Sequence, residues 1–197
     1  ISNQSNLKNI PCFGILGNLI LSFSKLLNQK AIHKPSAQHV LDDDYYKRIE
    51  AIQFTMSHDD GKKVDDINSA DVILLGVSRT SKTPTSIYLA NRGYKTINIP
   101  LVLEQKLPEN LNSTTKACVV GLVADPQRLA DIRRNRVAMM NDNQLKDYTN
   151  LDFIKKEVDD SRNLFKKNNW PVIDVTRRSV EETAASILKI IEIKRHK

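Results

Sequence analysis

The segment DVILLGVSRTSKTP, residues 71–84, constrains the fold of this chain more than any other part of the sequence. Its first residues form a short continuous apolar run, which is typical of a β-strand covered on both faces. The loop GVSRTSKT, residues 76–83, follows directly, and Pro84 stands where a helix accepts proline in its first turn. A buried strand, a loop and a helix in this order are the setting of a phosphate-binding P-loop. The segment therefore predicts an α/β fold with an anion site at the end of one strand.

The loop matches the P-loop pattern, GxxxxGK followed by Ser or Thr, at three positions. Gly76, Lys82 and Thr83 fit, whereas Ser81 replaces the second glycine. A left-handed backbone at this position costs a residue with a side chain about 1–2 kcal/mol relative to glycine. Backbone N–H groups would surround phosphate oxygens, Lys82 would neutralise the terminal phosphates, and the Thr83 hydroxyl would hold Mg²⁺. The alternative is a plain strand-to-helix turn with a solvated lysine. The predicted nucleotide-binding residues of the loop are Gly76, Val77, Ser78, Arg79, Thr80, Ser81, Lys82 and Thr83.

The sequence His58-Asp59-Asp60-Gly61 is the second candidate for chemistry. Two carboxylates beside a histidine can orient Mg²⁺, or take a proton from an attacking hydroxyl, if they face the loop. Adjacent side chains seldom both reach one ligand, and for either role we favour Asp60 slightly over Asp59. The alternative is that the cluster only ends a helix and forms a turn. The predicted catalytic set is Lys82, Asp59, Asp60 and His58.

A third candidate is the arginine-rich helix expected after Asp125 and Pro126. Arginine forks pair with phosphate in two-point contacts and stabilise charge on a transferring phosphoryl group. Such a run is also typical of a solvated helix face. We predict that at least one of these arginines contacts the nucleotide or a phosphorylated substrate, and Arg79 inside the loop is the better single candidate. The arginines of this helix are Arg128, Arg133 and Arg136.

Strand and helix signals alternate along the second part of the chain. Further strands are expected at 95–102, 117–123 and 172–175, and the helices between them imply a parallel sheet. A helix that begins after Asp42 carries Ile49, Ile52 and Met56 at helical spacing, and Ser179 with Glu182 matches a capping box. We therefore predict, over residues 41–197, an α/β P-loop kinase-like three-layer domain with a mostly parallel sheet.

The first 40 residues differ from the rest. An apolar run over residues 10–27 is interrupted by polar side chains, so it falls short of the roughly 20 apolar residues of a membrane span. We interpret it as a core helix, followed by a connector. Residues 1–40 are thus expected to be a helical remnant of an N-terminal region plus a connector.

Composition limits the partners. The formal charge of +7 favours anionic partners, but basic patches without interleaved aromatic residues argue against a single-strand nucleic-acid binder. The two cysteines, Cys12 and Cys118, lack metal-ligand spacing, and no secretory signal precedes them, so a cytoplasmic location is expected. We expect neither nucleic acid nor a membrane as a partner.

Four segments have a more specific meaning together: YYKRIEAIQFTMSHDDG (45–61), DVILLGVSRTSKTPTSIYLANRGYK (71–95), GLVADPQRLADIRRNR (121–136) and SVEETAASI (179–187). They resemble the bifunctional kinase-pyrophosphorylase regulators of pyruvate, phosphate dikinase and of phosphoenolpyruvate synthase. The resemblance begins near Ile10 and reaches the C-terminus. Members of this family normally begin with a further N-terminal region, which suggests that this chain starts after it.

The resemblance implies an unusual chemistry. The family uses ADP to phosphorylate a threonine of the target enzyme and so inactivates it, and it uses inorganic phosphate to remove the group with release of pyrophosphate. The nucleotide loop of the family corresponds to Gly76–Thr83, its HDDG segment to His58–Gly61, and its arginines to Arg128, Arg133 and Arg136. The pair Thr80-Ser81 resembles members that act on the dikinase, whereas synthase regulators more often carry Cys-Gly there.

These expectations give one main function and two alternatives. The main one is an ADP-dependent kinase and phosphate-dependent pyrophosphorylase. Its expected ligands are ADP, phosphate, pyrophosphate and Mg²⁺, and its expected target is the dikinase or the synthase. A homodimer is compatible with this function. The first alternative is a truncated module that binds nucleotide or the dikinase without catalysis. The second is an ATP-dependent P-loop kinase of a small metabolite.

Overall fold

The computed structural model describes residues 11, 16–31, 42–61, 66–102, 107–108, 111, 116–140 and 146–195. By its contacts the chain divides into two compact units, residues 1–40 and 41–197. The first unit holds helix α2 (Gly17–Leu26), none of whose side chains is buried, so the core helix expected here is wrong for the described residues. Among the described residues we find no helix with the length and apolar character needed to span a membrane.

The second unit is built on a sheet of four parallel strands in the order β2-β1-β3-β4. The strands are β1 (Val72–Gly76), β2 (Thr96–Pro100), β3 (Cys118–Val123) and β4 (Val172–Asp174), each within two residues of its predicted bounds. Every residue of β1 and β3 is buried, as continuous apolar runs predict. Gly76 is paired with Pro100 on one side and Leu122 on the other, so these three strands end at nearly the same level.

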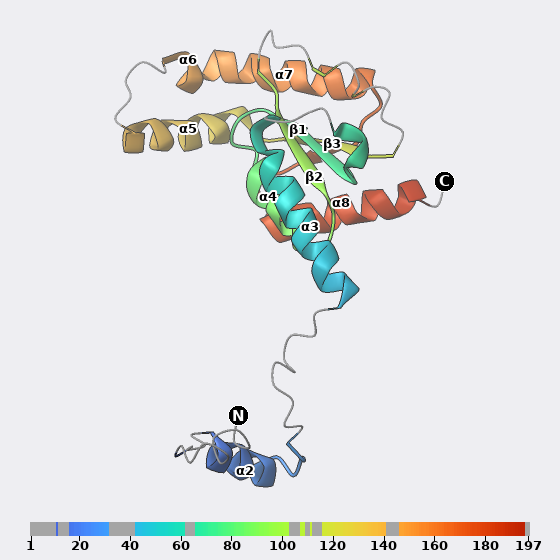
Figure 1. Cartoon of the computed structure of the whole chain (residues 1–197). Coiled ribbons are helices and arrows are strands. Elements are labelled where there is room, and N and C mark those ends of the chain that lie inside the picture. The colour runs from blue at the N-terminus through green and yellow to red at the C-terminus, as the bar shows by residue number, and fades with distance from the viewer. Residues whose placement is uncertain are drawn as a thin grey trace. The chain divides into compact units, whose positions relative to one another are not determined.

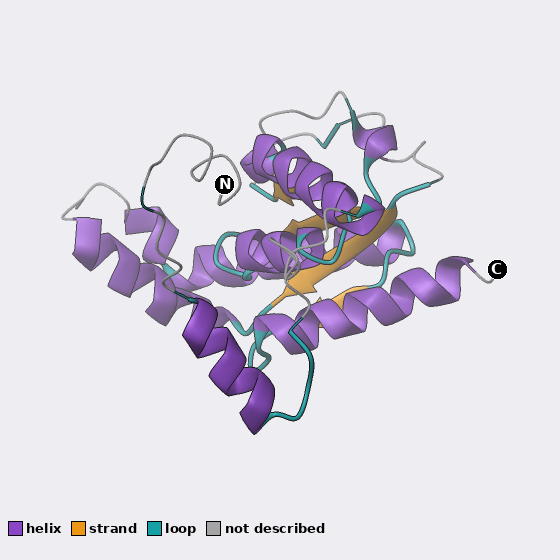
Figure 2. Ribbon diagram, turned by 60° about the horizontal axis from the view of Figure 1, so that its bottom comes forward, coloured by secondary structure: helices purple, strands orange, loops and turns teal. Residues whose placement is uncertain are grey.

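Helices cover both faces of this sheet and complete the predicted three-layer α/β fold (Figures 1 and 2). On one face, α4 (Lys82–Ala90) and α8 (Val180–Arg195) bury Leu89 and Ile187 against alternate residues of β1 and β3. On the other face, α7 (Leu151–Lys167) places Phe165 over Gly121, where an added Cβ would lie 2.5 Å from the ring. The α5 helix (Pro126–Met140) packs beside α7, with the short α6 (Lys146–Thr149) between them in sequence.

Helix α3 (Asp43–Ser57) begins as predicted, because the Asp42 carboxylate accepts a hydrogen bond from the Tyr45 N–H. Its buried face differs from the apolar spacing in the sequence: Ala51 and Thr55 are buried, whereas Met56 is 64% exposed. The helix packs against β2 and α4. At its end the Thr55 hydroxyl accepts a hydrogen bond from the Thr96 N–H on β2, so α3 lies along the outer edge of the sheet.

Two further elements precede β1. A single 3-10 turn, η1 (Asp59–Gly61), follows α3, and a second one, η2 (Ile67–Ser69), leads into the strand. The predicted capping box before α8 is present in both directions, since the Ser179 hydroxyl accepts from the Glu182 N–H and a Glu182 carboxylate oxygen accepts from the Ser179 N–H.

Candidate functional site

The predicted phosphate loop connects β1 to α4 with a strained backbone. Gly76 tolerates no side chain, because an added Cβ would lie 2.6 Å from the Leu122 carbonyl oxygen. Arg79 and Ser81 both have left-handed backbones, with φ of 72° and 57°, so the conformation expected at Ser81 is present and a second one was not foreseen. Left-handed non-glycine residues persist only where their surroundings hold them, and they gather at ligand sites.

A cavity of about 380 Å³ opens at this loop. It lies at the carboxyl ends of β1 and β2. From β1 the strand order of the sheet runs in both directions, to β2 on one side and to β3 on the other. Ligands of open α/β sheets bind at this kind of switch point. The cavity is lined by Asp60, Ser78, Arg79, Ser81, Lys82, Thr83, Pro84, Pro100 and Ile132, so it joins the predicted loop to one of the two predicted carboxylates.

Lys82 lines this cavity although its side chain is only 6% exposed. Its ammonium donates a hydrogen bond of 2.9 Å to the Val77 carbonyl, and the Thr80 hydroxyl donates to the same oxygen. Burial lowers the pKa of Lys82 to about 8, and while Arg133 and Arg79 add to the lowering, Asp60 and Asp59 oppose it. A desolvated ammonium beside a cavity has a strong electrostatic attraction for an entering phosphate.

The two carboxylates after α3 have different environments. One oxygen of Asp59 accepts hydrogen bonds from the Asn98 amide at 2.6 Å and from the Thr83 hydroxyl at 3.2 Å. Asp60, held by a left-handed backbone with φ of 55°, lines the cavity instead. Asp59 is therefore hydrogen-bonded to neighbouring side chains, whereas Asp60 faces the cavity.

Asn98 was missed by sequence reasoning. It is buried on β2, and its amide nitrogen donates both to Asp59 and, at 3.0 Å, to the Thr83 hydroxyl. Its amide oxygen is buried without a hydrogen-bond partner among the described residues. An asparagine inside an apolar strand, TINIP, is the signal that could have identified it, because a buried polar side chain requires partners.

Thr83 and Asp59 supply the hydroxyl and carboxylate oxygens that Mg²⁺ prefers. Magnesium is commonly held by one or two protein ligands together with substrate phosphates. The described residues contain no group of three or more acidic, histidine or cysteine side chains arranged for a metal ion. The adjacent Thr83 and Asp59 therefore fit a metal that arrives with phosphates better than a permanently bound one.

The His58 ring contacts Phe54 of α3 and lies near Asp66. It is 3% exposed and stacks on Phe54 with ring centroids 4.0 Å apart. Its Nδ1 lies 2.7 Å from the Phe54 carbonyl, and its Nε2 lies 3.9 Å from an Asp66 carboxylate oxygen. The ring is not among the residues that line the cavity, and its contacts secure the end of α3.

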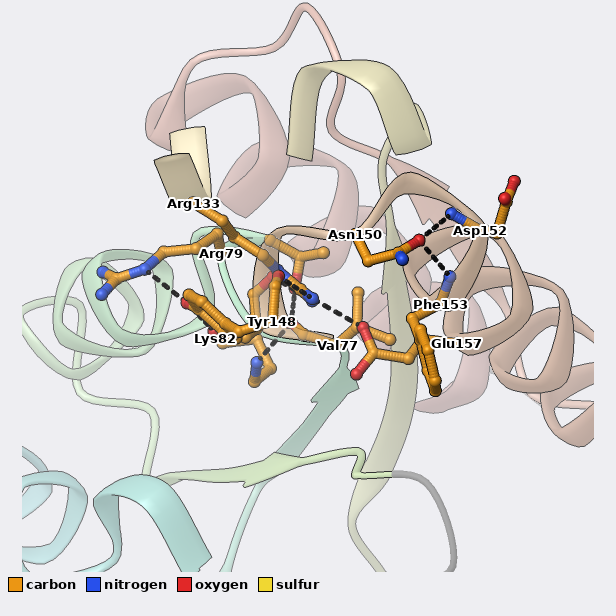
Figure 3. A network of polar contacts seen from close by, with 11 residues as sticks. Val77, Arg79, Lys82, Arg133, Tyr148, Asn150, Asp152, Phe153 and Glu157 are labelled. Carbon is orange, nitrogen blue, oxygen red and sulfur yellow. Dashed lines mark hydrogen bonds and ion pairs between the residues drawn. The ribbon is translucent and has the colours of Figure 1, made fainter. Parts of the chain in front are cut away.

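The three arginines of α5 separate in space. Arg133 is 1% exposed and reaches the loop, where it donates to the Ser78 carbonyl at 3.3 Å. It also forms an ion pair of 2.8 Å with Glu157 (Figure 3). Arg128 lines a second cavity of about 880 Å³ at the ends of β3 and β4, together with Thr176 and Arg177. Arg136 is exposed and lines neither cavity. Only Arg133 of the three contacts the loop.

Tyr148 on α6 is the second residue that sequence reasoning missed. Its hydroxyl shares a hydrogen bond of 2.8 Å with the Ser78 hydroxyl and accepts one of 3.3 Å from Arg79 Nε (Figure 3). Its ring lies under the Arg133 guanidinium, 4.7 Å from carbon to centroid. No local pattern in the sequence connects Tyr148 to the loop, because 70 residues separate it from Ser78.

Comparison with known proteins agrees with this architecture. The family model described as kinase/pyrophosphorylase matches residues 1–188. The chain belongs to this family. Among similar members, a protein of Pelagibacter ubique is 62% identical over 197 residues, all of this chain and 72% of its own length. Members from Rhizorhabdus wittichii and Erythrobacter litoralis are 46% and 49% identical, over 97% and 92% of this chain and 70% and 66% of their own lengths. All three are named as pyruvate, phosphate dikinase regulatory proteins.

Proposed function

We propose that this chain is a bifunctional serine/threonine kinase and pyrophosphorylase that regulates pyruvate, phosphate dikinase. In one direction ADP gives its terminal phosphate to a threonine of the dikinase, leaving AMP and an inactive target. In the other, inorganic phosphate attacks the phosphothreonine, restores the threonine hydroxyl and leaves as pyrophosphate. The observation that carries the proposal is the joining of Lys82, Thr83 and Asp60 in one cavity at the loop.

The loop and Lys82 account for phosphate binding in both directions. The N-terminus of α4 and the loop N–H groups attract anions, and Lys82 adds a positive charge in a desolvated position. In both reactions the cavity must hold two phosphate groups joined by a bridging oxygen, as substrate or as product. One binding site can therefore serve ADP and pyrophosphate.

Asp60 is the proposed proton acceptor for the threonine hydroxyl. It lines the cavity beside Lys82, and its carboxylate takes part in no hydrogen bond with another described residue. In the reverse direction the same group returns the proton to the threonine oxygen. Asp59 and Thr83 would hold Mg²⁺, which when bound neutralises charge on the transferring phosphoryl group.

The test is an assay of both reactions with purified dikinase. Replacing Lys82 by Met is expected to abolish the ADP-dependent inactivation and the phosphate-dependent reactivation, because both need the same cation. Lys155, an exposed residue on α7 that pairs with Asp152, gives the matched control Lys155→Met, which should keep both activities. Full activity of Lys82→Met would refute the loop assignment. Wild-type protein that binds ADP without inactivating the dikinase would favour a binding module instead.

A further inference from the structure

The helices beyond β3 contact the loop through Arg133 of α5 and, at the loop's side chains, through Tyr148 of α6. Its hydroxyl is within hydrogen-bond distance of the side chains of both Ser78 and Arg79, two residues that line the cavity. Tyr148 itself does not line the cavity. Any effect of this residue on a ligand must therefore pass through the loop.

Tyr148 is held in place by a buried cation, Arg133. Arg133 donates to the Tyr148 carbonyl at 3.2 Å, lies over the Tyr148 ring, and is paired with Glu157 on α7. The same guanidinium donates to the Ser78 carbonyl. Because this carbonyl accepts a hydrogen bond from a buried side chain, the backbone around Ser78 is held in one orientation. Arg133 and Tyr148 thus fix the same loop residue, one through its backbone and the other through its hydroxyl.

The position of Arg79 follows from this arrangement. Its Nε donates to the Tyr148 hydroxyl, while its two terminal nitrogens have no partner among the described residues (Figure 3). Its backbone is left-handed, an uncommon state for a residue with a long side chain. A guanidinium held by Nε keeps its terminal N–H groups available for a two-point contact with phosphate.

We propose that Tyr148 is a positioning residue, which holds Arg79 so that its terminal nitrogens meet the terminal phosphate of a bound nucleoside diphosphate. Arginine otherwise loses considerable rotamer freedom on binding, and fixing it beforehand reduces this cost. The identity of the ligand in this proposal rests on the function proposed above. The orientation of the loop is independent of that function, because the contacts that hold the loop are present in the protein without a ligand.

The first test uses the free protein. Tyr148→Phe keeps the ring over Arg133 and the backbone carbonyl but removes the hydroxyl. We expect amide hydrogen exchange of residues 77–82 to become about tenfold faster, since the loop loses a hydrogen bond to a charged group. Tyr88 provides the matched control, because its hydroxyl accepts from Arg92 at 3.1 Å and its ring also lies beside that guanidinium, on α4 outside the cavity. Tyr88→Phe should leave the exchange of residues 77–82 unchanged.

The second test is a double-mutant cycle on nucleotide affinity, measured by calorimetry. Tyr148→Phe should lower the affinity for ADP by about tenfold. The affinity for AMP, which lacks the terminal phosphate, should fall by less than about twofold. In an Arg79→Ala background the same change should have almost no effect on ADP. A merely structural role would lower both affinities alike and would persist without Arg79.

The outcomes separate the two proposals. Unchanged exchange of residues 77–82 in Tyr148→Phe would overturn the positioning role, whatever the nucleotide affinity. If Tyr148→Phe exchanged faster but the wild type bound no ADP, the role of Tyr148 in orienting the loop would stand and the proposed function would be refuted. Equal losses for ADP and AMP, or an undiminished loss in the Arg79→Ala background, would overturn the link to the terminal phosphate.

Discussion

The carboxylate of Asp59 accepts a hydrogen bond from the hydroxyl of Thr83 across 3.2 Å, which joins the turn after α3 to the first turn of α4. Asn98 donates to both partners from the neighbouring strand β2. The two oxygen ligands proposed for Mg²⁺ are therefore aligned by a third side chain that is itself no ligand.

Replacing Asn98 by Ala should reduce the affinity for ADP in the presence of Mg²⁺ by about 10–100-fold, as is usual when groups that orient metal ligands are removed. With a chelator present the same variant should bind ADP nearly as the wild type does. Titration calorimetry under both conditions measures the difference. Asn91→Ala is the control, since Asn91 only donates to the Ile87 carbonyl at the exposed end of α4. An equal loss with and without Mg²⁺ would contradict the alignment.

The buried Lys82 predicts a specific dependence of stability on pH. Its pKa is about 8 in the folded protein against 10.5 ordinarily, so between these values the unfolded chain binds more protons. The free energy of unfolding of the wild type should therefore rise with pH relative to Lys82→Met, by about 3 kcal/mol in total. Urea unfolding of both proteins from pH 7 to pH 10.5 gives the difference. A flat or falling difference would show that Lys82 is not desolvated.

The charge of the same residue predicts weaker phosphate binding at alkaline pH. Because Lys82 loses its proton as the pH passes about 8, the affinity for pyrophosphate should fall between pH 7 and 9. Lys82→Arg keeps its charge throughout this range and provides the comparison. If the wild type and Lys82→Arg show the same profile, the lysine does not control the titration.

The left-handed backbone of Ser81 leads us to expect that a glycine at this position would stabilise the protein. Ser81→Gly should raise the free energy of unfolding by about 0.5–1 kcal/mol, because glycine takes this backbone without a steric cost. Ser81→Ala retains the strain while removing the hydroxyl, and should leave stability almost unchanged. Thermal unfolding of the three proteins checks this. Equal stabilisation by glycine and alanine would show that the hydroxyl, not the backbone, is unfavourable.

Replacing the buried Arg133 should have a large effect on the stability of the protein. Arg133→Met leaves Glu157 without its partner and should cost about 3–5 kcal/mol of stability. Adding Glu157→Leu should recover part of the loss, whereas Arg136→Met, on the exposed face, should change stability by less than about 0.5 kcal/mol. Denaturant unfolding measures the stability of each protein. If the double variant were less stable than Arg133→Met alone, the result would argue against the pairing of Arg133 with Glu157.

The sequence was sufficient for most of the fold. Continuous apolar runs predicted β1 and β3, because strands buried on both faces need apolar side chains in succession. Local signals also located the start of α3 and the capping box of α8, since capping depends on residues three positions apart. The buried face of α3 was not predictable in this way. It depends on how the helix packs beside β2, where Ala51 is buried and the buried Thr55 hydroxyl accepts a hydrogen bond from the Thr96 N–H.

The site was predictable only where it is local. The loop and the two carboxylates lie in short contiguous segments, and the structure brings Asp60 and Lys82 to one cavity. Asn98 and Tyr148 reach the loop through tertiary packing, 15 and 70 residues from their partners Thr83 and Ser78. Arg128, Arg133 and Arg136 look alike in sequence, yet burial against Glu157 distinguishes Arg133 from the other two.

The position of α3 along β2 also protects the sheet from self-association. An open strand edge offers free N–H groups on which another chain can add a strand. On the outer side of β2, the N–H of Thr96 is bound by the Thr55 hydroxyl, that of Asn98 by the His58 carbonyl at 3.4 Å, and Pro100 has no N–H. The helix end that carries Asp59 and Asp60 to the phosphate loop thus also leaves none of the outward N–H groups of β2 (Thr96–Pro100) free to pair with a strand of another chain.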